Sequence, residues 1–220
     1  MFRVKICGVT TPADAAQAVA AGADAIGLNF YAKSPRCVSV EAARDVADAA
    51  RGALRVGVFV NASAGEITAI AVLAGLNAIQ LHGDEPASLL AELPAALPVV
   101  RAVRVGTEGL APALEWLEQA RRLSRPVAAL LADAAAAGAY GGSGKTADWR
   151  VLAEERGRLG ETPLVLAGGL TPENVAEAIR LVAPDGVDTA SGVEQSPGRK
   201  DADKVAQFVQ RAAEAFGAAR

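Results

Sequence analysis

A lysine and a cysteine lie two residues apart in the first strand-like run of the chain, residues 3–7 (RVKIC). Side chains alternate between the two faces of a strand, so Lys5 and Cys7 share one face. Thr11 and Pro12 then supply an N-cap and a first helical residue. Cys7 is therefore expected at the C-terminal end of a strand, where parallel α/β proteins carry out chemistry. A nearby cation would lower the pKa of its thiol, although free cysteine is more commonly a small buried hydrophobe.

A single carboxylate ends the sixth strand-like run. Residues 127–133 (VAALLAD) are apolar up to Asp133. Burial of a carboxylate costs free energy unless the group is paired or used. Desolvation would also raise its pKa, which would make Asp133 a competent general acid. From this run alone, a structural role as an N-cap or loop anchor is an equally good interpretation.

Arg36, Gln80 and His82 are further candidates for contacts with a ligand. Arg36 lies in a basic loop, and its planar guanidinium suits a carboxylate or phosphate, although the loop by itself favours a solvated arginine. Gln80 and His82 share one face of the fourth strand-like run, so both are expected to point toward the mouth of the fold. A lone histidine is more often structural than catalytic, so His82 is expected to line a pocket. Cys37 is interpreted as a local packing residue.

One glycine-rich segment resembles a nucleotide-binding loop. Residues 140–146 (YGGSGKT) contain Gly141, Gly142 and Gly144, which permit close approach of a ligand to the backbone. The P-loop pattern requires a glycine where this chain has Ala139, so that assignment fails. A phosphate-contacting or lid loop remains a suitable interpretation.

Two more small-residue segments follow the seventh and eighth strand-like runs. They contain Gly168 and Gly169 in the first case, and Ser191 and Gly192 in the second. Phosphate sites of α/β barrels are often built from these two loops. Ser191 and Glu194 also have the spacing of a capping box, which predicts a short helix there. Together the two segments predict a phosphorylated ligand.

The elements that must position these residues alternate regularly. Strand-like runs are predicted at 3–7, 24–29, 55–60, 77–82, 98–103, 127–133, 163–167 and 187–191. Helices are predicted near 12–21, 40–51, 63–73, 86–92, 108–122, 147–156, 172–182 and 201–214. This alternation favours a single (β/α)₈ barrel domain over residues 1–220. A doubly wound sheet, the main alternative, would usually carry a glycine-rich dinucleotide turn that the sequence lacks.

Composition narrows the classes of function. The chain of 220 residues is 51% apolar with a net charge of −3, which indicates a globular protein without the basic surface that nucleic acid or an anionic membrane attracts. Neither a membrane span nor a signal peptide is predicted. One histidine and two cysteines nearly exclude a zinc site and favour the reducing cytoplasm. Barrel closure would place Lys5 beside Asp188, so we expect a buried ion pair.

The sequence closely resembles the phosphoribosylanthranilate isomerase family of tryptophan biosynthesis. The segments that carry the resemblance span nearly the whole chain in order: KICG (5–8), GLNFYAKSPR (27–36), GVFVN (57–61), QLHG (80–83), YGGSGKTADW (140–149), LAGGLTPENV (166–175) and VDTASGVEQSPGRKD (187–201). The resemblance implies a (β/α)₈ barrel and an Amadori rearrangement of N-(5-phosphoribosyl)anthranilate. It also implies no metal and no organic cofactor. A cytoplasmic location is expected from the cysteine usage, and a monomer and a homodimer both stay open.

The resemblance further implies a role for each matching residue. Asp133 would be the general acid that opens the sugar ring, and Cys7 the general base that removes the C2 proton. Arg36 would hold the anthranilate carboxylate, and the glycine-rich loops would hold the phosphate. Two other functions stay open. The related aldose isomerase of histidine biosynthesis should carry an aspartate where Cys7 stands, and a non-catalytic phosphate-binding barrel would not need Cys7, Asp133 and Arg36 together.

Overall fold

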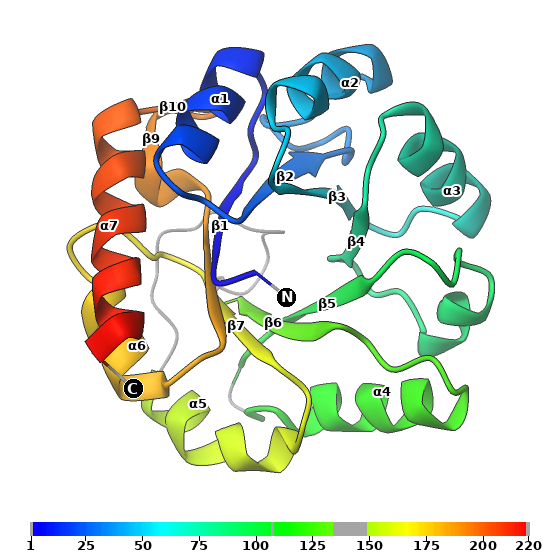
Figure 1. Ribbon diagram of the computed structural model, residues 1–220. Coiled ribbons are helices and arrows are strands. Elements are labelled where there is room, and N and C mark those ends of the chain that lie inside the picture. Colours follow the sequence, from blue (N-terminus) through cyan, green and yellow to red (C-terminus); the bar gives the residue numbers. More distant parts are fainter. Residues whose placement is uncertain (1, 107, 134–148, 219–220) are drawn as a thin grey trace.

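The computed structural model describes residues 2–106, 108–133 and 149–218. Within these ranges, eight parallel strands form a closed barrel in the order β1 to β8. Figure 1 shows the strands around the centre and the helices outside them. The strands are β1 (Val4–Cys7), β2 (Ala25–Asn29), β3 (Leu54–Phe59), β4 (Ala78–Leu81), β5 (Val99–Arg104), β6 (Ala129–Asp133), β7 (Leu164–Ala167) and β8 (Gly186–Thr189). The predicted fold class and all eight predicted strands are confirmed. Most of the strand ends differ from the predicted ones by one or two residues.

The helices of the described residues pack around the barrel. The α-helices are α1 (Pro12–Ala20), α2 (Val40–Ala49), α3 (Ala64–Leu73), α4 (Ala111–Arg122), α5 (Trp149–Glu155), α6 (Val175–Val182) and α7 (Ala202–Ala218). The 3₁₀ helices are η1 (Ala87–Ala91), η2 (Arg156–Leu159) and η3 (Ser191–Val193). A helix was predicted at 86–92, and a helix does form there, but it is the short 3₁₀ helix η1. Pro94 and Pro98 follow closely and prevent a longer α-helix. No described helix has the length and hydropathy needed to cross a lipid bilayer.

Local sequence explains the start of α1, the helix that follows Cys7. The Thr11 side chain accepts a hydrogen bond from the Asp14 amide at 3.1 Å, and Pro12 occupies the first turn, as predicted. Val4 and Ile6 on β1 belong to the apolar layer between strands and helices. Their neighbours in sequence consequently point into the barrel, where a second apolar cluster fills the interior.

A hairpin in the loop after β8 was not predicted. Strands β9 (Glu194–Ser196) and β10 (Arg199–Lys200) pair antiparallel and form a separate two-stranded sheet. Figure 1 shows this hairpin between α1 and α7. The strands are three and two residues long, too short for alternation to identify them in the sequence. The hairpin matters for the site because it carries Glu194 and Lys200.

Candidate active site

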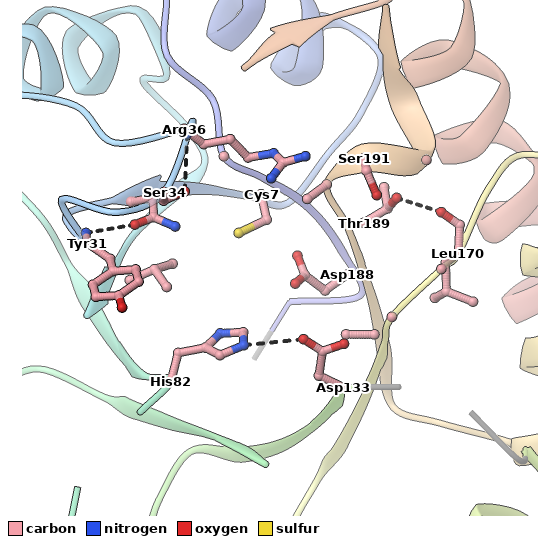
Figure 2. Close-up of a pocket in the computed structure, with 18 of the residues that line it drawn as sticks. Cys7, Tyr31, Ser34, Arg36, His82, Asp133, Leu170, Asp188, Thr189 and Ser191 are labelled. Atoms are coloured by element: carbon pink, nitrogen blue, oxygen red, sulfur yellow. Dashed lines mark hydrogen bonds and ion pairs between the residues drawn. The ribbon is translucent and has the colours of Figure 1, made fainter. Parts of the chain in front are cut away.

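One cavity at the C-terminal ends of the strands brings together most of the predicted site residues. From the predicted set it is lined by Cys7, Arg36, His82, Asp133, Gly168, Gly169, Ser191 and Gly192. Figure 2 shows Cys7 and Asp133 directed into the cavity from different strands, with Asp188 between them. Two groups suited to proton transfer thus face one ligand-sized space from β1 and β6.

Cys7 lies beside a buried ion pair. Lys5 Nζ donates to Asp188 Oδ1 at 2.8 Å, and the lysine is fully buried, which confirms the predicted pairing across β1 and β8. Burial alone would lower the pKa of Lys5, but Asp188 and Cys7 outweigh burial and raise it. The pKa of the Cys7 thiol is also raised, because burial exceeds the opposing effect of Lys5. Lys5 does lower the pKa of the thiol, as expected, but burial and the Asp188 carboxylate raise it by more, so the expected net lowering was wrong.

Asp133 is linked to the single histidine of the chain. Its Oδ2 lies 3.3 Å from His82 Nε2, and His82 Nδ1 lies 2.7 Å from Gln80 Nε2. The structure corrects the expected position of Gln80, which is fully buried and does not line the cavity. Gln80 belongs to a deeper layer of the barrel because residues two apart on a strand point the same way at different depths.

Arg36 is held by a carboxylate of the chain. Its Nε donates to Glu194 Oε1 at 2.8 Å, and its Nη2 donates to Glu194 Oε2 at 2.7 Å. Lys200 Nζ also donates to Glu194 Oε1, at 2.9 Å. Glu194 therefore does not form the capping box predicted with Ser191, and η3 has no side-chain cap. Two cations outcompete one backbone amide for this carboxylate.

The loops after β7 and β8 are packed tightly against one another. Gly168 and Gly169 have φ angles of 86° and 66°, in the region that favours glycine. A Cβ atom at Gly192 would collide with the Leu170 carbonyl, and the Thr189 hydroxyl donates to that same carbonyl at 2.7 Å. Backbone from both loops therefore approaches the cavity closely, without side chains to occupy the space.

Some predictions remain outside this site. Gly141, Gly142 and Gly144 lie outside the described residues, as does the 134–139 loop. Cys37 is exposed, so its interpretation as a packing residue was wrong, although it forms a backbone bridge with Asn29 at the end of β2. Sequence reasoning did not single out Asn29 and Tyr31, which line the cavity. Both lie within the segment 27–36 that carries the family resemblance, and that segment was the available signal.

No metal centre is evident in the part of the chain that the structure describes. No group of three or more His, Cys, Asp or Glu side chains there is arranged to hold a metal ion. Asp188, an acidic residue of the cavity lining, is paired with Lys5. The described cavity instead offers a thiol, a carboxyl, an imidazole and a guanidinium.

Comparison with known proteins agrees with this geometry. Residues 4–211 match the family model described as N-(5'-phosphoribosyl)anthranilate (PRA) isomerase. The N-(5'-phosphoribosyl)anthranilate isomerase of Acidithiobacillus ferrooxidans is 46% identical, covering 96% of this chain and 97% of that protein. That of Thermotoga neapolitana is 45% identical, covering 96% and 98%.

Solved structures give the same result. The phosphoribosyl anthranilate isomerase of Thermotoga maritima superposes with a TM-score of 0.86 at 42% identity, covering 97% of this chain and all (100%) of that one. A phosphoribosyl anthranilate isomerase in complex with reduced 1-(o-carboxyphenylamino)-1-deoxyribulose 5-phosphate superposes with a TM-score of 0.82 at 40% identity, with the same coverage. The chain is an isomerase, and it belongs to the N-(5'-phosphoribosyl)anthranilate isomerase family.

Proposed function

We propose that the protein converts N-(5'-phosphoribosyl)anthranilate to 1-(2-carboxyphenylamino)-1-deoxyribulose 5-phosphate, with Asp133 as general acid and Cys7 as general base. The observation that carries this assignment is that both groups line one cavity from separate strands, β6 and β1. An acid and a base on different sides of one substrate can act in turn on its ring oxygen and on C2. The related complex with a reduced product supports the same ligand chemistry here.

The reaction needs one proton given and one taken. Asp133 gives its proton to the ring oxygen of the sugar as the bond from that oxygen to C1 breaks, and the nitrogen lone pair forms a C1=N iminium. Cys7, as thiolate, takes the proton from C2, and the electrons of that bond form a C1=C2 enolamine. Loss of the O2 proton and protonation of C1 then give the ketone. The substrate gains no net proton, but these steps leave Asp133 as the carboxylate and Cys7 as the thiol. Both residues return to their starting states when Asp133 takes up a proton from solvent and Cys7 releases one to it.

The raised pKa of the Cys7 thiol fits a base that ionises only with substrate present. Burial makes the Cys7 thiolate unfavourable, and Lys5 offsets this only in part. The iminium formed after ring opening carries a positive charge, which stabilises a neighbouring anion. The thiolate is therefore most favoured at the step that uses it, and solvent-borne reagents meet mainly the thiol before that step.

The two ends of the substrate correspond to two parts of the cavity. Glu194 takes the side of the Arg36 guanidinium formed by Nε and Nη2, which leaves the end formed by Nη1 and Nη2 for the anthranilate carboxylate. The glycine loops after β7 and β8 can place amides close to the 5'-phosphate. We assign Gly168, Gly169, Ser191 and Gly192 to the phosphate on this basis.

Turnover of N-(5'-phosphoribosyl)anthranilate by the wild type and two variants tests this proposal. Asp133→Asn keeps the size of the side chain but removes the transferable proton, and Cys7→Ser replaces a thiol by a hydroxyl that hardly ionises. We expect kcat to fall by about 10²–10⁴-fold in each variant. Affinity for a reduced product analogue should persist, because Arg36 and the phosphate loops are unchanged. Loss of substrate fluorescence follows the reaction.

Three results would contradict the proposal. A wild-type protein that binds the substrate without converting it would be a binding barrel. Faster conversion of the phosphoribosyl substrate of the histidine pathway would place the protein with that isomerase class. Near wild-type kcat in either variant would remove that residue from its assigned role.

We also infer a cytoplasmic protein that acts as a monomer or homodimer. Cys7 and Cys37 are both free thiols, and the exposed Cys37 would stay reduced in the cytoplasm. A related Thermotoga maritima protein is described as a dimeric phosphoribosylanthranilate isomerase that was also converted to monomers.

A further inference from the structure

Gln80, His82 and Asp133 form a hydrogen-bonded chain that leads from the barrel interior to the cavity. The Gln80 Nε2 to His82 Nδ1 distance is 2.7 Å, and the His82 Nε2 to Asp133 Oδ2 distance is 3.3 Å. Figure 2 shows the imidazole of His82 directed at the Asp133 carboxyl. Gln80 is fully buried and does not line the cavity, so its described route to a ligand runs through His82.

The direction of the hydrogen bonds decides where the acid proton resides. A neutral imidazole has one donor nitrogen and one acceptor nitrogen. When the Gln80 amide donates to Nδ1, the imidazole proton is on Nε2, and Nε2–H donates to Asp133 Oδ2. The proton of the Asp133 carboxylic acid is then left to Oδ1. Asp133 Oδ1 is buried and has no hydrogen-bond partner among the described residues, so a ligand atom can take that place.

The opposite amide orientation would have the opposite effect. With Gln80 Oε1 against Nδ1, the proton would be on Nδ1 and Nε2 would accept a hydrogen bond. Asp133 would then direct its proton at His82 instead of at the ligand. The orientation of one buried amide therefore decides whether Asp133 can serve as an acid toward the cavity.

We propose that Gln80 and His82 are positioning residues, which hold the Asp133 proton on the oxygen that faces the substrate. This inference rests on the proposed role of Asp133 as general acid. The His82 Nε2–H donates to Oδ2 both before and after proton transfer, and such a bond is stronger once Asp133 is a carboxylate. His82 thus favours release of the proton without taking it. Among the described residues, Asp188 also interacts with Asp133, and Asp188 is itself paired with Lys5.

The single histidine of the chain makes the tautomer directly measurable. Labelling with ¹⁵N-histidine gives one imidazole, and its two nitrogen chemical shifts report which nitrogen carries the proton. We expect the wild-type protein to show a protonated Nε2 and an unprotonated Nδ1. This measurement requires no variant, so it does not depend on the folding of an altered barrel.

Gln80→Glu tests whether the tautomer controls catalysis. A glutamate accepts a hydrogen bond from Nδ1–H, so the variant should place the imidazole proton on Nδ1 and leave Nε2 as an acceptor toward Asp133. We expect kcat to fall by about 10²-fold, the lower end of a general acid contribution. KM should change by less than about threefold, because Gln80 does not contact the cavity. Gln80→Met, of similar length but without hydrogen bonds, should give mixed tautomers and an intermediate kcat.

Gln17→Glu is a matched control, because it makes the same chemical change on the exposed surface of α1. It should leave both the tautomer and kcat unchanged. A wild-type imidazole with its proton on Nδ1 would overturn the inference, as would a Gln80→Glu protein with a reversed tautomer and unchanged kcat. Full activity in Asp133→Asn, or no turnover by the wild type, would instead contradict the proposed function, whatever the spectrum shows.

Discussion

The side chain of Cys7 occupies space that is available only because the residue opposite it, Gly27, is a glycine. Gly27 on β2 pairs with Cys7 on β1, and a Cβ atom there would lie 2.7 Å from Cys7 Sγ and 3.2 Å from Lys5 Cε. Real Cβ atoms hardly ever approach a sulfur so closely. The absence of a side chain at Gly27 therefore leaves the space in which the thiol is held between the ion pair and the cavity.

Gly27→Ala should consequently reduce catalysis more than stability. The added methyl group would displace the thiol, and a shift of about 1 Å at a reacting group can cost about 10²-fold in rate. We expect kcat to fall by that order, with product-analogue affinity largely retained. Steady-state kinetics with N-(5'-phosphoribosyl)anthranilate would check this. Gly65→Ala on α3 is the control, since its Cβ would meet nothing within 4 Å. A kcat of Gly27→Ala equal to that of the wild type would show that the thiol can accommodate the added methyl group without loss of catalysis.

At the scale of elements, the β9–β10 hairpin holds Arg36, the residue that we propose binds the anthranilate carboxylate. It brings Glu194 and Lys200 together, and Glu194 in turn holds the guanidinium of Arg36 from the loop after β2. Burial alone would raise the pKa of Glu194, but its bonds with Arg36 and Lys200 outweigh burial and lower the pKa below its ordinary value of 4.5. The contacts of Glu194 that hold Arg36 therefore also contribute to the stability of the fold, and that contribution depends on pH.

Glu194→Gln should lower stability at pH 7, and the difference from the wild type should shrink on acidification. A carboxyl with a lowered folded pKa stabilises the fold above its unfolded pKa, and that stability is lost as pH falls through the folded value. The difference should therefore be constant near neutral pH and diminish below about pH 4.5. Urea unfolding at a series of pH values measures this, with the exposed Glu92→Gln as control. A difference that grows on acidification would contradict the prediction.

At the scale of the whole molecule, the Lys5–Asp188 pair joins the first strand of the barrel to the last. Both residues are buried, at 0% and 6% exposure, and they face each other in the register of β1 and β8. The barrel interior that holds the pair also contains an apolar cluster, which includes Val56, Val100 and Leu131. Removal of one partner leaves a buried charge without compensation, whereas replacement of both by apolar residues can restore packing.

Lys5→Met should therefore destabilise the barrel by about 3–5 kcal/mol. The double variant Lys5→Met/Asp188→Leu should recover much of that loss, although its activity should remain low because Asp188 lines the cavity. Urea unfolding of both variants and the wild type gives the comparison. Additive losses in the double variant would show that the two residues stabilise the barrel independently.

The sequence by itself determined the barrel, because each local signal agreed with the others. Alternating strand and helix patterns, the Thr11–Pro12 start of α1 and the apolar faces of the strands all predict one arrangement. Closure of eight such units also implied the Lys5–Asp188 pair. The positions of Cys7, Asp133 and the glycine loops at one end of the barrel followed from the same periodicity.

Only the tertiary structure decided which polar groups meet. Spacing along the chain cannot show that Glu194, from a two-stranded hairpin, binds Arg36 instead of capping η3. It cannot show that Gln80 lies too deep to touch a ligand and contacts His82 instead. It also cannot show that burial raises the pKa of the Cys7 thiol by more than Lys5, which is paired with Asp188, lowers it. These outcomes depend on distances between residues up to 183 positions apart, and those distances are set by closure of the barrel.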